Sequence, residues 1–157
     1  MIRGIIETNI LVGANGGADH LSIDDQEKCI SFIKLYKEES LTYIDSLGLV
    51  FKEYQKYCSF SGKPNVGDYF FKWLWDNQAN DKICKSVEIN PIDEDGCNFR
   101  ELSALPKLDK FDKSDKKFVA ISVSSNKEPT IFNACDSDWN QFSLAFKEYG
   151  IKVEKII

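Results

Sequence analysis

Apolar segments of two kinds alternate along this chain. Short runs rich in β-branched and aromatic residues, typical of buried strands, are separated by longer segments whose apolar residues recur at helical spacing. Strands that alternate with helices are most economically folded as a parallel sheet with right-handed crossover connections. We therefore predict an α/β fold of three layers, α/β/α, with a central and mainly parallel sheet.

The predicted strands are short and end in polar residues. Two apolar runs, Ile5–Ile6 and Ile10–Val12, flank the polar residues Glu7 to Asn9, and Glu7 is expected to close the first strand. Further strands are predicted at residues 41–44, 83–89, 130–135 and 151–157.

Helices are predicted between these strands. Ser22, followed by acidic residues, is typical of a helix start, and Ser114 is a second candidate cap, for a helix that runs to Val123. Gly150 is expected to stop the last helix. The segment 92–112 is acidic and broken by glycine and proline, which indicates a surface excursion with one short helix near residues 99–102. The other helical patterns cover residues 47–58, 66–78 and 142–149.

Length and charge narrow the class of protein. The 157 residues fit one domain, 1–157, and the 20 Lys and Arg against 25 Asp and Glu give a net charge of −5. The net field therefore cannot attract nucleic acid, so a polyanion would need a basic strip or a metal ion. No segment is typical of a membrane span or a cleaved leader, so we expect a cytoplasmic protein that does not contact a membrane.

The cysteines do not suggest a metal or disulfide framework. Five of them are scattered without a Cys-x-x-Cys pair, and His20 is the one histidine available as a partner ligand. We interpret them as reduced, mostly buried small hydrophobic residues.

Several carboxylates are expected at one edge of the sheet. The carboxyl ends of parallel strands meet at the same edge, where Glu7, Glu53, Asp115 and Asp136 would converge. Clustered carboxylates repel one another, and Mg²⁺ or Mn²⁺ commonly stabilises them. Each acid taken alone also has a structural interpretation, as a first-turn acid, a helix cap or a solvated residue.

Four segments in order resemble PIN-domain nucleases. Glu7-Thr8-Asn9-Ile10-Leu11 is similar to the opening motif of that family, and Phe51-Lys52-Glu53-Tyr54 is similar to the helix with its second acid. The segment 112–120 resembles the third-acid motif, and 131–139, which contains Asp136 and Asp138, resembles the fourth. The match covers nearly the whole chain, including the closing helix and strand.

The resemblance implies a PIN-like fold and metal-dependent hydrolysis of RNA phosphodiesters. Glu7, Glu53, Asp115 and Asp136 would be the catalytic acids, and Mg²⁺ or Mn²⁺ would be held by Glu7, Asp115, Asp136 and Asp138. Thr8, Asn9 and Asp112 would support them. The expected products carry a 5′-phosphate and a 3′-hydroxyl. Small stand-alone members of the family are toxins that pair with an antitoxin protein and form homodimers, so both are candidate partners besides RNA.

One residue departs from the family pattern. The family has Asp where this chain has Glu7, and the additional methylene moves the carboxylate by about a bond length, enough to cost about a hundredfold in rate. A catalytically impaired, PIN-like module that binds RNA or protein is therefore the alternative function.

Two further features have a functional and a structural interpretation each. A cluster of lysines could contact the RNA backbone or be ordinary solvated surface: Lys52, Lys56, Lys113, Lys116 and Lys117. The aromatic segment 69–75 could supply a dimer interface or belong to the core.

Overall fold

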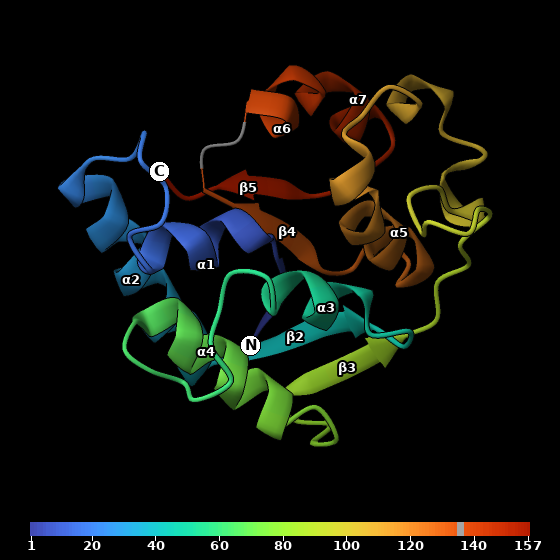
Figure 1. Ribbon diagram of the computed structural model, residues 1–157. Coiled ribbons are helices and arrows are strands. Elements are labelled where there is room, and N and C mark those ends of the chain that lie inside the picture. The colour runs from blue at the N-terminus through green and yellow to red at the C-terminus, as the bar shows by residue number, and fades with distance from the viewer. Residues whose placement is uncertain (135–136) are drawn as a thin grey trace.

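A computed structural model describes residues 1–134 and 137–157 and contains one five-stranded sheet (Figure 1). The strands are β1 (Ile2–Ile6), β2 (Ser40–Asp45), β3 (Cys84–Val87), β4 (Thr130–Asn133) and β5 (Val153–Lys155). Their order is β3-β2-β1-β4-β5, and every pairing is parallel. The predicted α/β architecture with a parallel sheet is confirmed.

Helices fill the connections between the strands. The α-helices are α1 (Thr8–Ala14), α2 (Ile23–Glu38), α3 (Leu49–Tyr54), α4 (Val66–Asp76), α5 (Lys116–Ser124), α6 (Ser137–Gln141) and α7 (Ser143–Glu148). Three short 3₁₀ helices precede α5: η1 (Arg100–Leu102), η2 (Pro106–Leu108) and η3 (Lys113–Asp115).

The helices form two layers around the sheet. Helix α1 packs against α2 and α4, whereas α5 packs against β1, β2 and β4. In Figure 1, α1 and α2 lie to the left and α5 to the right, while α6 and α7 lie above β5. Strand β1 lies at the centre of the sheet with Ile5 paired to Ile131, and both side chains are fully buried.

The first polar break in the sequence is a change from strand to helix. Glu7 has an extended backbone, and its side chain accepts a hydrogen bond from the Asn9 amide, so that it caps α1 directly after β1. The second apolar run, Ile10–Val12, therefore lies in α1, where Ile10 and Leu11 are buried. Glu7 closes the first strand as predicted.

One predicted cap is confirmed and another is wrong. The Ser22 side chain accepts a hydrogen bond from the Asp25 amide at the start of α2. At the start of η3, by contrast, the Asp112 side chain is the cap, because it accepts hydrogen bonds from the amide and the hydroxyl of Ser114. Asp112 therefore orders the turn that leads into Asp115.

The segment 92–112 is only partly the surface excursion that its acidity suggests: residues 92–98 are exposed or half-buried and the short helix predicted near residues 99–102 is η1, but the rest packs against the core. Five of its apolar residues are buried, at a spacing of three: Phe99, Leu102, Leu105, Leu108 and Phe111. A spacing of three matches the 3.0 residues per turn of a 3₁₀ helix, and it holds η1 and η2 against the core.

The aromatic segment in α4 is mostly core. Phe70, Phe71 and Leu74 are buried, and Trp73 and Trp75 are partly buried against the core, whereas Tyr69 is exposed. The cysteines Cys29, Cys58 and Cys84 are also buried, as predicted, and Cys135 lies outside the described residues. Within residues 1–134 and 137–157, no helix has the length and apolar character needed to cross a membrane.

Candidate active site

A cavity of about 770 Å³ opens at the carboxyl edge of the sheet. We call it the acidic cavity, because five of the described residues that line it are acids and none is Lys or Arg. The acids are Glu7, Asp19, Glu53, Asp112 and Asp115. They come from the end of β1, the loop before α2, helix α3, and the turn around η3. Distant parts of the sequence thus meet at one place.

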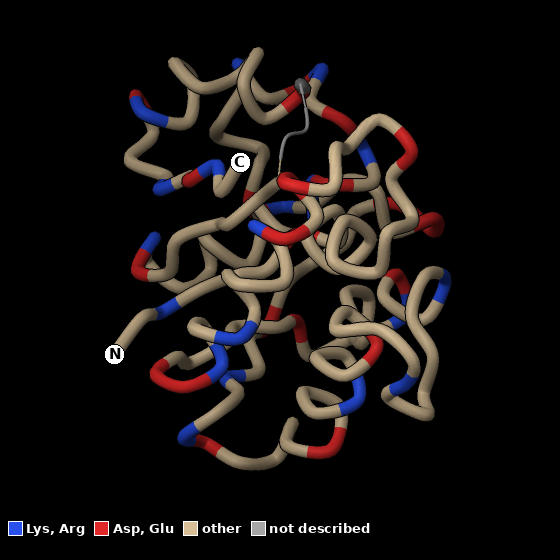
Figure 2. The backbone as a smooth tube through the Cα atoms, turned by 90° about the vertical axis from the view of Figure 1, so that its left-hand side faces the viewer, with Lys and Arg blue, Asp and Glu red and all other residues tan. Residues whose placement is uncertain are grey.

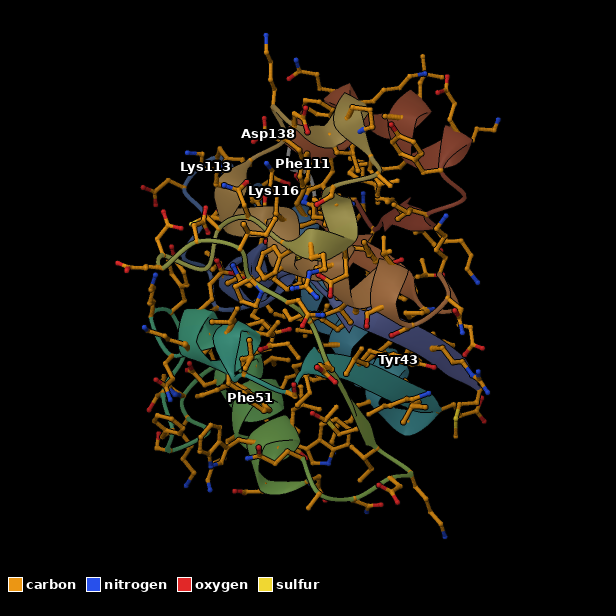
Figure 3. All side chains as sticks on the ribbon, turned by 90° about the vertical axis from the view of Figure 1, so that its right-hand side faces the viewer. Tyr43, Phe51, Phe111, Lys113, Lys116 and Asp138 are labelled. Carbon is orange, nitrogen blue, oxygen red and sulfur yellow. The ribbon has the colours of Figure 1, made fainter. Side chains whose placement is uncertain are left out.

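Most of the residues singled out from the sequence line this cavity. Glu7, Glu53 and Asp115 do so, together with Thr8, Asn9 and Asp112. Asp136 lies outside the described residues. Asp138 is a half-buried residue in the first turn of α6 and is not among the described residues that line the cavity. In Figure 3 it appears in the upper part of the molecule, in the same region as Lys113 and Phe111.

Glu7 is held firmly at the end of the central strand. Its side chain is only 4% exposed, and Oε2 accepts a hydrogen bond from the Asn9 amide at 3.2 Å. The Glu7 amide donates to the Phe132 carbonyl at 3.0 Å, which continues the β1–β4 pairing by one residue. The side chain of Glu7, one methylene longer than the Asp of the family pattern, therefore starts from a backbone position that these hydrogen bonds fix.

Both oxygens of the Glu53 carboxylate are engaged. The Thr8 hydroxyl donates to Oε2, and Lys117 Nζ donates to Oε1 at 3.0 Å. The Glu53 and Lys117 side chains are 14% and 12% exposed. Sequence reasoning left Lys117 as either a contact to the RNA backbone or solvated surface, whereas the structure gives it a carboxylate as partner.

The side chains of two residues, Asp45 and Tyr54, fix helix α3, which carries Glu53. Asp45 ends β2 with a buried carboxylate that accepts the amides of Leu47, Leu49 and Val50, and so anchors the start of α3. At the other end of α3 the Tyr54 hydroxyl donates to the Ile6 carbonyl. Burial raises the pKa of the Tyr54 phenol well above its usual value, and Tyr36 and the carboxylates of Glu53 and Glu7 raise it further. We expect Tyr54 to stay protonated.

Asn9 links the end of β1 to the end of β4 beside the acidic cavity. Its Oδ1 accepts a hydrogen bond from the Ala134 amide at 2.9 Å, directly after β4. Its Nδ2 is buried and has no hydrogen-bond partner among the described residues. A buried amide donor without a partner is costly, and Asn9 is one of the residues that line the acidic cavity.

Part of the predicted lysine cluster has another role. Lys116 is buried, and its Nζ donates to Asn98 Oδ1 at 3.1 Å and to the Asp109 carbonyl at 2.9 Å, so it holds the loop before α5. Sequence reasoning left Lys116 as either an RNA contact or ordinary solvated surface, and its burial agrees with neither. Lys52, Lys56 and Lys113 are exposed. In the view of Figure 2, Lys and Arg residues are interspersed with Asp and Glu along the backbone.

The donor chemistry of the cavity suits a hard divalent cation only in part. Carboxylate oxygens are the ligands that Mg²⁺ and Mn²⁺ prefer, and Mg²⁺ is commonly held by one or two carboxylates with waters in its other positions. Within residues 1–134 and 137–157, however, no three His, Cys, Asp or Glu side chains are placed to hold one ion. A cation would therefore use one or two of the described carboxylates together with water.

Sequence reasoning missed three residues at the rim. Asp19 and His20 lie in the loop before α2, and Tyr57, which is 56% exposed, lies after α3. The loop that carries Asp19 and His20 is short and has no periodic pattern, so no signal in the sequence placed it beside the strand ends.

Comparison of the chain with protein families, with curated proteins and with solved structures found no match.

Proposed function

We propose that the protein is a metal-dependent endoribonuclease that hydrolyses RNA phosphodiester bonds in the acidic cavity. One observation supports this proposal above the others: Glu7, Glu53 and Asp115, from three separate segments, line one cavity at the carboxyl edge of a parallel sheet. Ligands commonly bind at that edge in open α/β sheets. The choice of RNA, and of an antitoxin protein and a second copy of the chain as partners, follows from the resemblance to PIN-domain nucleases.

Each residue of the acidic cavity would have a separate role in this reaction. Glu7 and Asp115 would hold the cation, with Asp136 as a further ligand, and Glu53 would act directly or through water. A bound Mg²⁺ or Mn²⁺ supplies an activated water and neutralises charge on the phosphoryl group. The water oxygen would bond to phosphorus as the bond to the 3′ oxygen breaks, and a proton of that water would pass to the 3′ oxygen, which would give a 5′-phosphate and a 3′-hydroxyl. Asn9 Nδ2 would donate a hydrogen bond within the cavity, since it has no partner among the described residues.

Cleavage of a mixed RNA pool with Mn²⁺ tests the proposal. We expect cleavage by the wild-type protein, its loss in Asp115→Asn, and its retention in Asp109→Asn, a control that alters an exposed acid outside the cavity lining. Glu7→Asp should change the rate in either direction, because the carboxylate moves relative to the cation. If wild type and Asp115→Asn are equally active or equally inactive, the proposal fails.

A second measurement tests whether the protein binds the cation in the absence of RNA. A cation that binds only the folded protein raises its melting temperature by mass action. We expect Mn²⁺ to raise the melting temperature of the wild type and to have much less effect on Asp115→Asn. An unchanged melting curve at millimolar Mn²⁺ would contradict the metal site.

The second candidate function is a PIN-like module that binds RNA or protein without cleaving it. The ion pair between Glu53 and Lys117 favours this candidate, because a lysine already neutralises one of the acids. RNA that is bound but left intact in the presence of Mn²⁺ would support this candidate over the nuclease.

A further inference from the structure

A second cavity lies beside the acidic one and has the opposite charge. It measures about 630 Å³ and is lined by residues at both ends of β4, by β5 and the residues just before it, and by helices α6 and α7. These elements lie in the upper half of Figure 1. The described residues that line it include three lysines, Lys147, Lys152 and Lys155, and one acid, Glu154. We call it the lysine cavity. Its lining suits an anion.

Two buried polar atoms of residues that line the lysine cavity have no hydrogen-bond partner in the part of the chain that the structure describes. Asn133 and Trp139 are each 1% exposed, and neither Asn133 Oδ1 nor Trp139 Nε1 has a hydrogen-bond partner among the described residues. Asn133 Nδ2 is engaged by the Glu154 carbonyl at 3.3 Å. One acceptor and one donor thus remain unsatisfied, and buried polar groups normally find partners.

A nucleotide would satisfy both kinds of group. The edge of a nucleobase presents hydrogen-bond donors and acceptors side by side, and unstacked bases of single-stranded RNA are read in this way. Its phosphate would meet the lysines. The aromatic rings of Trp139 and Phe146, which stack with centroids 5.3 Å apart, form an apolar part of the lining.

The position of the lysine cavity relates it to the proposed cleavage site. Asn133 lines the lysine cavity, and the next residue, Ala134, lines the acidic cavity. The end of β4 therefore lies between the two cavities. A single strand with its scissile bond in the acidic cavity has a neighbouring nucleotide close to the lysine cavity.

We propose that the lysine cavity binds one nucleotide of a single-stranded RNA substrate next to the cleavage site. Its place in catalysis rests on the proposed function, whereas the binding of a nucleotide does not. The lysines would hold the phosphate, and Asn133 Oδ1 with Trp139 Nε1 would bond the base.

Titration with adenosine 5′-monophosphate in EDTA, followed by ¹H–¹⁵N NMR, tests the proposal without a metal ion. The indole resonance of Trp139, assigned with Trp139→Phe, should shift with saturation, while those of Trp73 and Trp75 should not. Inorganic phosphate serves as the second arm, and it should bind more weakly because it lacks a base. Equal binding of the two would contradict recognition of a nucleotide.

Charge-reversal variants distinguish binding at the lysine cavity from a general electrostatic attraction between the protein and the nucleotide. Lys147→Glu and Lys152→Glu should each weaken binding about fivefold, the effect of one exposed charge contact. Lys34→Glu, on the exposed face of α2, is the control and should leave binding unchanged. Absence of a Trp139 shift at millimolar nucleotide, or equal weakening by all three variants, overturns the proposal.

The two proposals fail independently. If the Trp139 indole shifts but no RNA is cleaved with Mn²⁺, the nucleotide site stands and the nuclease is wrong. If RNA is cleaved and the Trp139 indole does not shift, the nuclease stands and the nucleotide site is wrong.

Discussion

Lys117 and Glu53 form a largely buried ion pair between α5 and α3, with Nζ and Oε1 3.0 Å apart. Thr8 donates to the other oxygen of the same carboxylate. Three elements that are distant in the sequence, α1, α3 and α5, are therefore linked through one side chain at the wall of the acidic cavity.

Lys117→Met should destabilise the protein by about 1–3 kcal/mol, less than for a fully buried pair because both side chains retain some exposure. The methionine keeps the apolar stem but leaves the Glu53 carboxylate with one partner fewer. Urea denaturation measures the change, and Lys113→Met, at an exposed position, is the control. Adding Glu53→Gln should recover part of the loss. If the effects of Lys117→Met and Glu53→Gln on the free energy of unfolding simply add in the double variant, the ion pair contributes no coupling energy.

The free energy of unfolding should fall as the pH rises above about 10. Burial raises the pKa of the Tyr36 and Tyr54 phenols above the ordinary value of 10.0. Below that value both phenols are protonated in the folded and unfolded chains, and the full stability is present; above it the unfolded chain loses protons that the folded chain retains. Urea midpoints across this range measure the effect. The decline should be shallower in Tyr54→Phe, and an equal slope in both proteins would argue against a raised pKa at Tyr54.

Asp45→Ala should destabilise the protein by about 1–3 kcal/mol, because three backbone amides at the start of α3 lose their acceptor. Asp45→Asn retains an acceptor oxygen and should cost less. Urea denaturation compares the two variants. If the protein cleaves RNA as proposed, Asp45→Ala should also lower the rate of cleavage, since α3 carries Glu53. Equal stability of both variants and the wild type would show that the cap is dispensable.

Gly67→Ala should destabilise the protein by about 1–3 kcal/mol although alanine favours helices. A Cβ at Gly67 would collide with the Leu11 carbonyl oxygen and with Asn15 Oδ1, where α4 crosses α1 closely. Ser31→Ala, on the exposed face of α2, isolates the gain in helix propensity and should not destabilise. Thermal and urea unfolding report both changes. A stabilised Gly67→Ala would mean that α4 can move away from α1.

Local patterns in the sequence were sufficient for the architecture. The Ser22 cap, the strand at residues 41–44 and the end of the last helix before Gly150 each depend on a few adjacent residues, and each agrees with the structure. The segment 92–112 agrees with the prediction only in part: its short helix near residues 99–102 was predicted, but its buried residues were not, because a spacing of three belongs to 3₁₀ turns and is missed by a test for α-helical spacing. The acidic residues of this segment also make its buried apolar residues harder to recognise from the sequence.

The candidate site was less accessible to sequence reasoning. The strand-end rule predicted that Glu7, Glu53, Asp115 and Asp136 converge; the first three line the acidic cavity, and Asp136 lies outside the described residues. The partners of those acids could not be predicted in the same way. Lys117 follows Asp115 and Lys116 in a run of charges, and only the three-dimensional packing buries Lys116 under Asn98 while Lys117 meets Glu53. Roles within a charged run depend on tertiary contacts.

The central position of β1 also constrains the order in which the molecule can assemble. Among the strands of the sheet, β1 comes first in the sequence, but its partners begin at Ser40 and at Thr130, so its second edge stays unpaired until β4 has been made. Contacts between such distant residues slow folding and leave a strand edge available to other chains in the meantime. The acidic cavity needs both Glu7 and Ala134 and therefore forms only when this late pairing is complete. Until β4 has been made, a nascent chain would therefore lack the acidic cavity.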